Sequence, residues 1–198
     1  MAVIVLIVLI LLNAFFAASE IALISLNDNR IRAMAEDGNK KAKLLVGLLR
    51  EPSRFLATIQ IGITLAGFLA SAFAAESFAD DLAAFAARNG APVPLEVLHT
   101  IALVVITLVL SYFTLVFGEL VPKRLAMKKA EPIAMLAVRP LAALSAVTYP
   151  VVRLLTWSTN LVVRLFGVDP NADDEEVTEE EIRMMVDVGE ERGAIDET

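Results

Sequence analysis

The chain contains no cysteine and a single histidine, His99, among its 198 residues. The absence of cysteine excludes disulfide bonds, thiolate metal ligands and thiol nucleophiles. One histidine likewise excludes a zinc or copper centre built from several imidazole rings. A metal ion bound by this chain must therefore be held by oxygen atoms, which favours hard cations such as Mg²⁺, Ca²⁺ or Na⁺.

What the chain has in abundance is apolar sequence. Hydrophobic residues make up 57% of it and the mean hydropathy is +0.67, far outside the range of soluble globular proteins. The formal net charge of -7 is an average over segments of opposite sign. We therefore expect a membrane protein whose surroundings are the lipid bilayer, and we expect no nucleic-acid partner.

Three apolar stretches are long enough to cross a bilayer, which takes about 20 helical residues. They cover about residues 2–26, 55–79 and 95–117. A signal peptide is the competing interpretation of the first stretch. That stretch has no basic start and stays apolar past any plausible cleavage point, so we interpret it as a spanning helix. The sequence thus predicts an all-α membrane protein with three transmembrane helices.

A fourth apolar stretch, residues 133–166, is interrupted by Pro140 and Pro150 and carries Arg153 and Arg164. Pieces of about ten to fifteen residues are typical of interfacial or re-entrant helices, so we assign residues 121–166 to the cytosolic interface. With three crossings, Arg88 is the only lysine or arginine on the outer side, and the other 16 of the 17 lie inside. This predicts an outer N-terminus and a cytosolic C-terminus in the plasma membrane, whereas a fourth crossing would export the tail.

The segments outside these stretches are polar. Residues 28–50 are basic with apolar residues at helical spacings, and Gly38-Asn39 breaks the pattern, so we expect two short amphipathic helices at the cytosolic interface. Ser53 is the expected N-cap of the second span, and residues 76–94 the expected outer connection. Thr178 and Glu181 form a capping-box pattern within the acidic run 173–181.

We therefore expect a transmembrane domain over residues 1–168. An acidic, helical cytosolic connector should follow over residues 169–198. The second element of this connector is interrupted at Thr198, which suggests a cut from a longer chain.

The block from Gly118 to Lys123 is the strongest candidate for a functional site. Glu119 ends an uncharged run, and a carboxylate is expensive in hydrocarbon, so it requires a partner or a function. Gly118 lets the backbone leave helical geometry, and Pro122 clashes with the Gly118 carbonyl while removing its hydrogen-bond donor. Backbone carbonyls near Glu119 are therefore expected to be free to act as ligands. The alternative is a helix end at which Glu119 pairs with Lys123 or Arg124.

Polar residues also interrupt the first span. Asn13 and Glu20 are seven residues apart and share a helix face. Ser19 and Ser25 diverge by about 120°, so both face one ion only if the helix unwinds or bulges locally. A membrane serine also often bonds its own i−4 carbonyl, which is the alternative for both.

A polar stripe runs along the second span at spacings of four, three and four residues, with Gly62 as a further point where the helix can loosen. Its members are Gln60, Thr64, Gly67 and Ser71. Such a stripe fits a packing seam against another helix, and it also fits a set of oxygen ligands for a cation.

Three blocks in this order, residues 13–25, 60–67 and 118–123, resemble the transmembrane domain of the cyclin-M/CorC magnesium transporter family. Residues 179–183 and 189–193 add to the resemblance. It implies a homodimeric Mg²⁺ transporter, often described as a Na⁺-coupled exporter. It also implies that a pair of nucleotide-sensing CBS modules follows the membrane part, with residues 173–181 in the connector toward them.

Under this resemblance the site binds dehydrated Mg²⁺, which requires near-octahedral oxygen coordination at about 2.1 Å. Glu119 would supply the charge. Hydroxyl groups and freed carbonyls would complete the ligand set, from Ser19, Ser25, Ser71, Gly67 and Gly118. Supporting residues, or a Na⁺ site, would comprise Asn13, Glu20, Gln60, Gly62, Thr64, Pro122 and Lys123.

Two other functions compete with transport. In a membrane scaffold or Mg²⁺ sensor, the polar residues would serve helix packing and the acidic tail would bind a partner. An intramembrane enzyme would need a Ser/His or Asp pair at membrane depth. His99 lies near the outer end of its span and no such Asp pair is present, so we expect no enzymatic activity.

Overall fold

The computed structural model of the chain describes residues 1–90, 93–167, 183 and 186. Among these residues all regular structure is helical, as predicted. The helices are α1 (Ala2–Ile24), α2 (Asp28–Glu36), α3 (Lys40–Leu49), α4 (Pro52–Arg88), α5 (Leu95–Leu115), η1 (Val116–Leu120), α6 (Val121–Lys128) and α7 (Ala130–Leu165). The chain divides into two units, Met1–Val152 and Arg153–Thr198. Apart from residues 183 and 186, the predicted acidic connector lies outside the described residues, and so does its capping box at Thr178 and Glu181.

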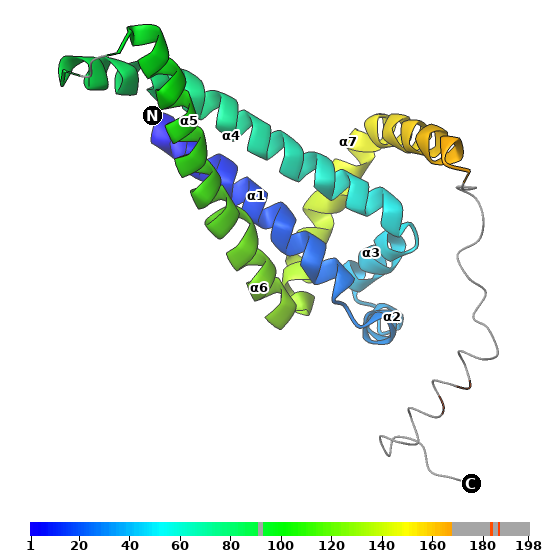
Figure 1. The fold of residues 1–198 in the computed structure, drawn as a ribbon. Coiled ribbons are helices and arrows are strands. Elements are labelled where there is room, and N and C mark those ends of the chain that lie inside the picture. Colours follow the sequence, from blue (N-terminus) through cyan, green and yellow to red (C-terminus); the bar gives the residue numbers. More distant parts are fainter. Residues whose placement is uncertain (91–92, 168–182, 184–185, 187–198) are drawn as a thin grey trace. The chain divides into compact units, whose positions relative to one another are not determined.

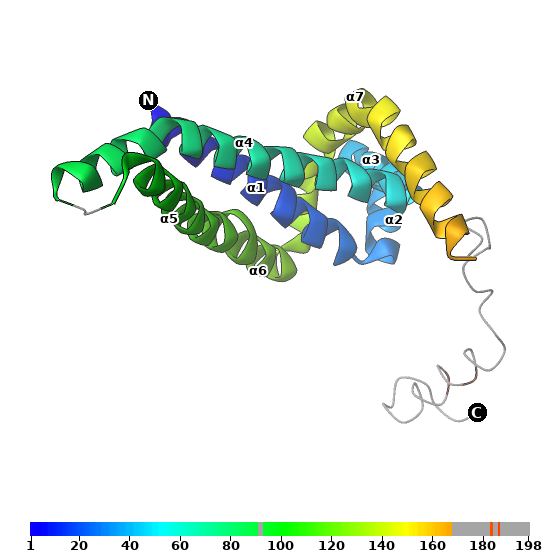
Figure 2. The same ribbon diagram turned by 45° about the horizontal axis from the view of Figure 1, so that its top comes forward.

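The first unit is built on α1, α4 and α5, which lie side by side in both views (Figure 1, Figure 2). The N-terminus, the end of α4 and the start of α5 lie at one end of this bundle. The helices α2, α3 and α6 lie at the opposite end (Figure 1). The basic residues between 30 and 54 and between 123 and 129 therefore share one end, which is the arrangement that a single cytosolic face requires. The orientation of the termini stays a prediction.

The contact between α1 and α4 depends on small residues spaced four apart on α4. Gly62 lies against Phe16, and Ala66, Ala70 and Ala74 are each at most 5% exposed. The predicted polar stripe lies on another face, and its members Gln60 and Thr64 are exposed. Within a single chain, the packing seam is therefore the glycine–alanine series and not the polar stripe.

The two amphipathic helices predicted between residues 28 and 50 are confirmed, with Gly38 at a φ of 91° between them. The Asn27 side chain accepts a hydrogen bond from the first turn of α2, and the Asn39 side chain does the same for α3. Ile31 and Leu45 are at most 1% exposed and belong to the hydrophobic core of the unit. The apolar faces of α2 and α3 therefore pack against the end of the bundle.

Two predictions about α4 are wrong. Its N-cap is Glu51 rather than Ser53, because Pro52 takes the first helical position, where a missing N–H costs nothing. The helix also continues through the expected outer connection to Arg88. Ala83, in these added turns, packs with Leu98 and Ala102 of α5 in a second small core, so the extension is held by tertiary contacts.

The predicted breaks in the fourth apolar stretch are also wrong, since α7 is one helix that contains both Pro140 and Pro150. Each proline leaves the carbonyl four residues earlier without its helical donor, a loss that membrane helices tolerate when neighbouring groups compensate. Thr148 connects α7 to α4 through a 3.4 Å hydrogen bond to the hydroxyl of Thr58. By length and composition α7 is a fourth candidate span among the described helices, so the three-crossing topology stays a prediction.

Candidate functional site

The centre of the candidate site is the π-helix η1, which connects α5 to α6. The N–H of Val121 donates to the carbonyl of Val116, five residues earlier instead of four. Pro122 supplies the physical reason, because it has no N–H to offer the Gly118 carbonyl in a regular α-helix. Single π turns inside α-helices occur frequently at functional sites. The predicted departure from α-helical geometry around Gly118 is confirmed.

The Gly118 carbonyl accepts a hydrogen bond from α1. The Asn13 side-chain N–H donates to this carbonyl at 3.0 Å across a sequence separation of 105 residues, and Asn13 is only 3% exposed. A Cβ atom on Gly118 would lie 3.2 Å from Asn13 Nδ2 and 3.4 Å from the Ile10 carbonyl, so glycine permits the close approach. The freed carbonyl predicted from the sequence is therefore present, and in this conformation a buried amide satisfies it.

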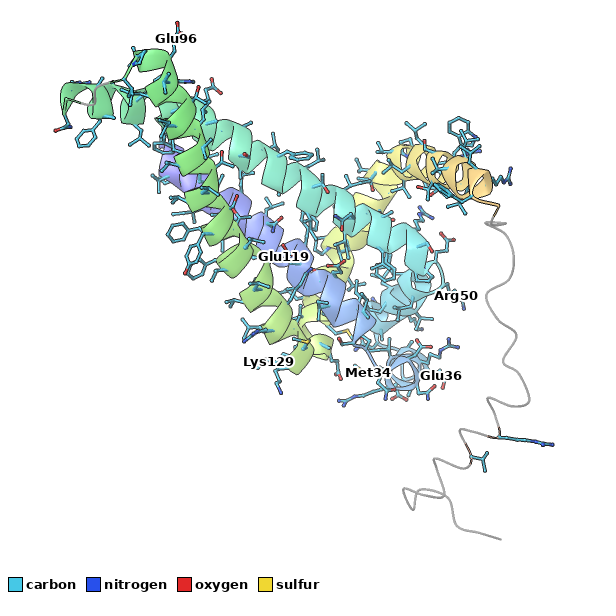
Figure 3. All side chains as sticks on the ribbon, in the orientation of Figure 1. Met34, Glu36, Arg50, Glu96, Glu119 and Lys129 are labelled. Carbon is cyan, nitrogen blue, oxygen red and sulfur yellow. The ribbon has the colours of Figure 1, made fainter. Side chains whose placement is uncertain are left out.

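Two carboxylates meet one ammonium group beside this contact. Lys123 Nζ lies 2.9 Å from Glu119 Oε1 and 3.2 Å from Glu20 Oε2. Figure 3 shows Glu119 between Glu96, at one end of the bundle, and Lys129, at the other. The pairing of Glu119 with Lys123, which the sequence left as an alternative, is thus present. The structure adds a second acid from α1, so the three groups together carry one net negative charge.

The predicted ligands of the first span have different environments. Ser19 is 1% exposed, and its hydroxyl donates to the Phe15 carbonyl at 2.6 Å. That bond uses the proton and leaves the lone pairs of the oxygen available as acceptors. Ser25 is the exposed C-cap residue of α1. The structure therefore places Ser19 inside the bundle and Ser25 at its edge.

The predicted residues on α4 are not joined to this centre. Among the described residues, no hydrogen bond or ion pair connects Ser71 or Thr64 with Glu119; Thr64 instead accepts a 3.5 Å hydrogen bond from Gln60. Gly67 has open space beside it, whereas a Cβ atom on Gly62 would lie 2.6 Å from the Phe16 ring. Gly62 thus serves helix packing, and the others line a separate face of α4.

Sequence reasoning missed Thr114. Its hydroxyl is buried and has no hydrogen-bond partner in the described part of the chain. A helical threonine usually bonds the carbonyl four residues earlier, so an unbonded buried hydroxyl is unusual. Thr114 lies four residues before Gly118, and this spacing was the signal that could have identified it.

Nothing in the described ranges brings three or more histidine, aspartate or glutamate side chains together as a metal centre. A cation at this site would therefore rely on the carboxylates of Glu20 and Glu119, supplemented by hydroxyl and carbonyl oxygens. Such a donor set is composed of hard oxygen ligands, as expected for a chain that lacks cysteine.

The long apolar helices and the paired acids define a helical, multi-pass membrane domain with a polar centre inside its bundle. The chain belongs to the CNNM family, described as the cyclin M transmembrane N-terminal domain, whose family profile matches residues 4–198. The resemblance stated from the three sequence blocks is confirmed.

Several bacterial proteins are similar to this chain. The UPF0053 protein sll0260 of Synechocystis sp. is 39% identical over 190 residues, which cover 96% of this chain and 42% of the relative. The UPF0053 protein YhdP of Bacillus subtilis is 31% identical over 194 residues (96% and 43%). The UPF0053 inner membrane protein YfjD of Escherichia coli is 31% identical over 176 residues (88% and 37%). The chain thus spans about two fifths of the length of these relatives.

Proposed function

We propose that the chain is the membrane domain of a homodimeric Mg²⁺ transporter of the plasma membrane, which exports Mg²⁺ in exchange for Na⁺. The observation that carries the proposal is the position of Glu119 on a π-helix within a candidate span, next to the carboxylate of Glu20. Intramembrane acids that face a bundle are rare and commonly mark ion pathways. In longer relatives further modules, of the CBS type in our proposal, would regulate this domain.

The proposed ligand set follows from the chemistry of the centre. Glu119 and Glu20 supply negative charge, while the Ser19 oxygen and the unbonded Thr114 hydroxyl supply neutral donors. The set proposed from the sequence also includes Gly118, whose carbonyl lies at the centre, and Ser25, Gly67 and Ser71, which in this conformation lie outside it. Mg²⁺ prefers such oxygen donors, but it gives up its bound water reluctantly. Because only two carboxylates offset the cost of removing that water, we expect moderate affinity and ready release of the ion after transport.

The direct test is Mg²⁺ flux in vesicles that contain the purified protein. Vesicles loaded with Mg²⁺ should lose it when Na⁺ is supplied outside, and the loss should slow when K⁺ replaces Na⁺. A Mg²⁺-sensitive dye measures the exit, with protein-free vesicles as the control. Absence of Mg²⁺ movement under Na⁺ gradients of either sign would contradict transport.

One observation favours the scaffold or sensor alternative. Lys123 already pairs with both carboxylates, so the two acids have a cationic partner without a metal ion. A sensor would be stabilised by Mg²⁺ against heat but would move none across vesicles. A scaffold would show neither effect, so thermal unfolding and flux together separate the three functions.

Thr114 provides a prediction for the ligand set. Replacing it with valine removes the hydroxyl while keeping the shape, and no hydrogen bond of the described chain is lost. We expect unchanged stability without Mg²⁺, together with about a tenfold higher Mg²⁺ concentration for half-maximal thermal stabilisation, which corresponds to ~1.4 kcal/mol. Thr100→Val, at a threonine whose hydroxyl bonds the Glu96 carbonyl near the start of α5, is the control. An unchanged Mg²⁺ midpoint in Thr114→Val would remove this residue from the set.

A further inference from the structure

We infer that Lys123 is a tethered competitor of the transported cation, whose ammonium group occupies the position between Glu20 and Glu119 that the metal ion takes during transport. The inference rests on the proposed function and adds the role of Lys123 to it. It is carried by the bridging geometry, in which one nitrogen lies 3.2 Å and 2.9 Å from oxygens of two different helical elements.

The geometry suits an exchange between ammonium and metal ion. Because both carboxylate oxygens lie about 3 Å from one nitrogen, they lie within about 6 Å of each other. Opposite ligands of an octahedral Mg²⁺ ion are ~4 Å apart, so a contraction of about 2 Å or less lets the same two oxygens hold the ion. The site that holds the ammonium is therefore close in size to the site that a metal ion needs.

The charges of the centre favour a divalent ion between the two carboxylates, and they disfavour a site that holds neither a metal ion nor the ammonium group. Two carboxylates facing each other in a bundle of low dielectric constant repel, and the ammonium removes most of this repulsion. When Mg²⁺ replaces the ammonium, the charge of the centre rises from one net negative charge to zero. Lys123 thus stabilises the empty site and weakens cation binding, because it must leave before the ion enters.

The lysine side chain is also able to leave. An ammonium on a four-carbon stem is a compact, mobile charge, whereas an arginine fork would bind both acids more rigidly. The Lys123 side chain is 27% exposed in the isolated chain, so its outward path is partly open. Among the described residues it is the one lysine whose ion pairs connect two helical elements. Exposed pairs within one helix, such as Arg32 with Asp28, contribute little.

The experiment is a Mg²⁺ titration of thermal unfolding with the whole purified protein. Lys123→Met removes the charge and keeps the length of the side chain. We expect it to unfold at a lower temperature without Mg²⁺, and to reach half-maximal stabilisation at about tenfold lower Mg²⁺ than the unaltered protein. Lys123→Arg keeps the positive charge but places it on a planar, forked guanidinium group that holds both acids more rigidly. This variant should need at least about threefold more Mg²⁺ than the unaltered protein for half-maximal stabilisation. Lys128→Met, at a lysine with no ion pair in the described chain, is the matched control and should behave as the unaltered protein.

Each outcome decides the inference. An equal Mg²⁺ midpoint in Lys123→Met, or a complete loss of Mg²⁺ stabilisation there, overturns it. If Lys123→Met does not give folded protein, the arginine variant decides, because an unchanged or lower midpoint in that variant also overturns the competition. If the unaltered protein is neither stabilised by Mg²⁺ nor able to move it, the proposed function fails first. If that protein passes both tests and the variants do not shift the midpoint, only the role of Lys123 fails.

Discussion

Replacing Glu119 with glutamine will lower the initial rate of Mg²⁺ exit from vesicles by at least about tenfold. The amide keeps the size of the side chain but removes the charge that a dehydrated divalent ion requires inside the bundle. Lys123 then retains only Glu20 as an acidic partner, so the ammonium and the remaining carboxylate neutralise each other. The measurement compares initial rates at equal amounts of reconstituted protein.

A matched control for this variant is Glu96→Gln. Glu96 lies in the first turn of α5, at the end of the bundle remote from η1 (Figure 3). Its rate should equal that of the unaltered protein. Size-exclusion chromatography shows whether Glu119→Gln is folded. A folded Glu119→Gln variant with full flux would remove this carboxylate from the transport site.

Gly62→Leu should produce the largest loss of stability. Even a Cβ atom at this position would lie 2.6 Å from the ring of Phe16, which is 6% exposed, so a leucine must push the ring or separate α1 from α4. Overpacking of this kind costs about 3 kcal/mol. For a chain of this size we expect the melting temperature to fall by roughly 6–12 °C. Thermal unfolding in detergent measures it.

Two further variants isolate the cause. In the double variant Gly62→Leu with Phe16→Ala, the new side chain enters the space of the deleted ring, so the two changes together should cost less than their sum. Gly67→Leu, on the same helix with nothing within 4 Å of the added Cβ atom, should leave the melting temperature nearly unchanged. Additive losses in the double variant would refute a direct Gly62–Phe16 contact as the cause.

Local signals were sufficient for much of the fold. Gly38, with its positive φ, separates α2 from α3, and Asn39 caps the second of them as its side-chain chemistry predicts. The extension of α4 to Arg88 was missed because hydropathy identifies only the part of a helix that lies within the lipid. The added turns are stabilised instead by the packing of Ala83 against α5. The single α7 was missed because Pro140 and Pro150 predict breaks, whereas membrane helices tolerate prolines in their interior.

The site was predictable only in part. The loss of α-helical geometry at Gly118 follows from Pro122 four residues later, a local rule of covalent chemistry. The pairing of Glu119 with Lys123 follows equally from their spacing of four. The donation from Asn13 to Gly118 and the arrival of Glu20 depend on how α1 packs against η1. No periodicity in the sequence specifies that packing, so these partners emerge only from the fold.

The length of α4 has a consequence for how movements of this protein can be observed. Its 37 residues extend about 55 Å at 1.5 Å per residue, whereas the hydrocarbon core is about 30 Å thick. Even at a tilt of 40°, about 12 Å of helix projects beyond the lipid. Residues 80–88 lie on this projecting end of α4. A spin label or antibody epitope placed there would therefore report, from the aqueous side, changes in the tilt of the part of the helix that lies within the lipid.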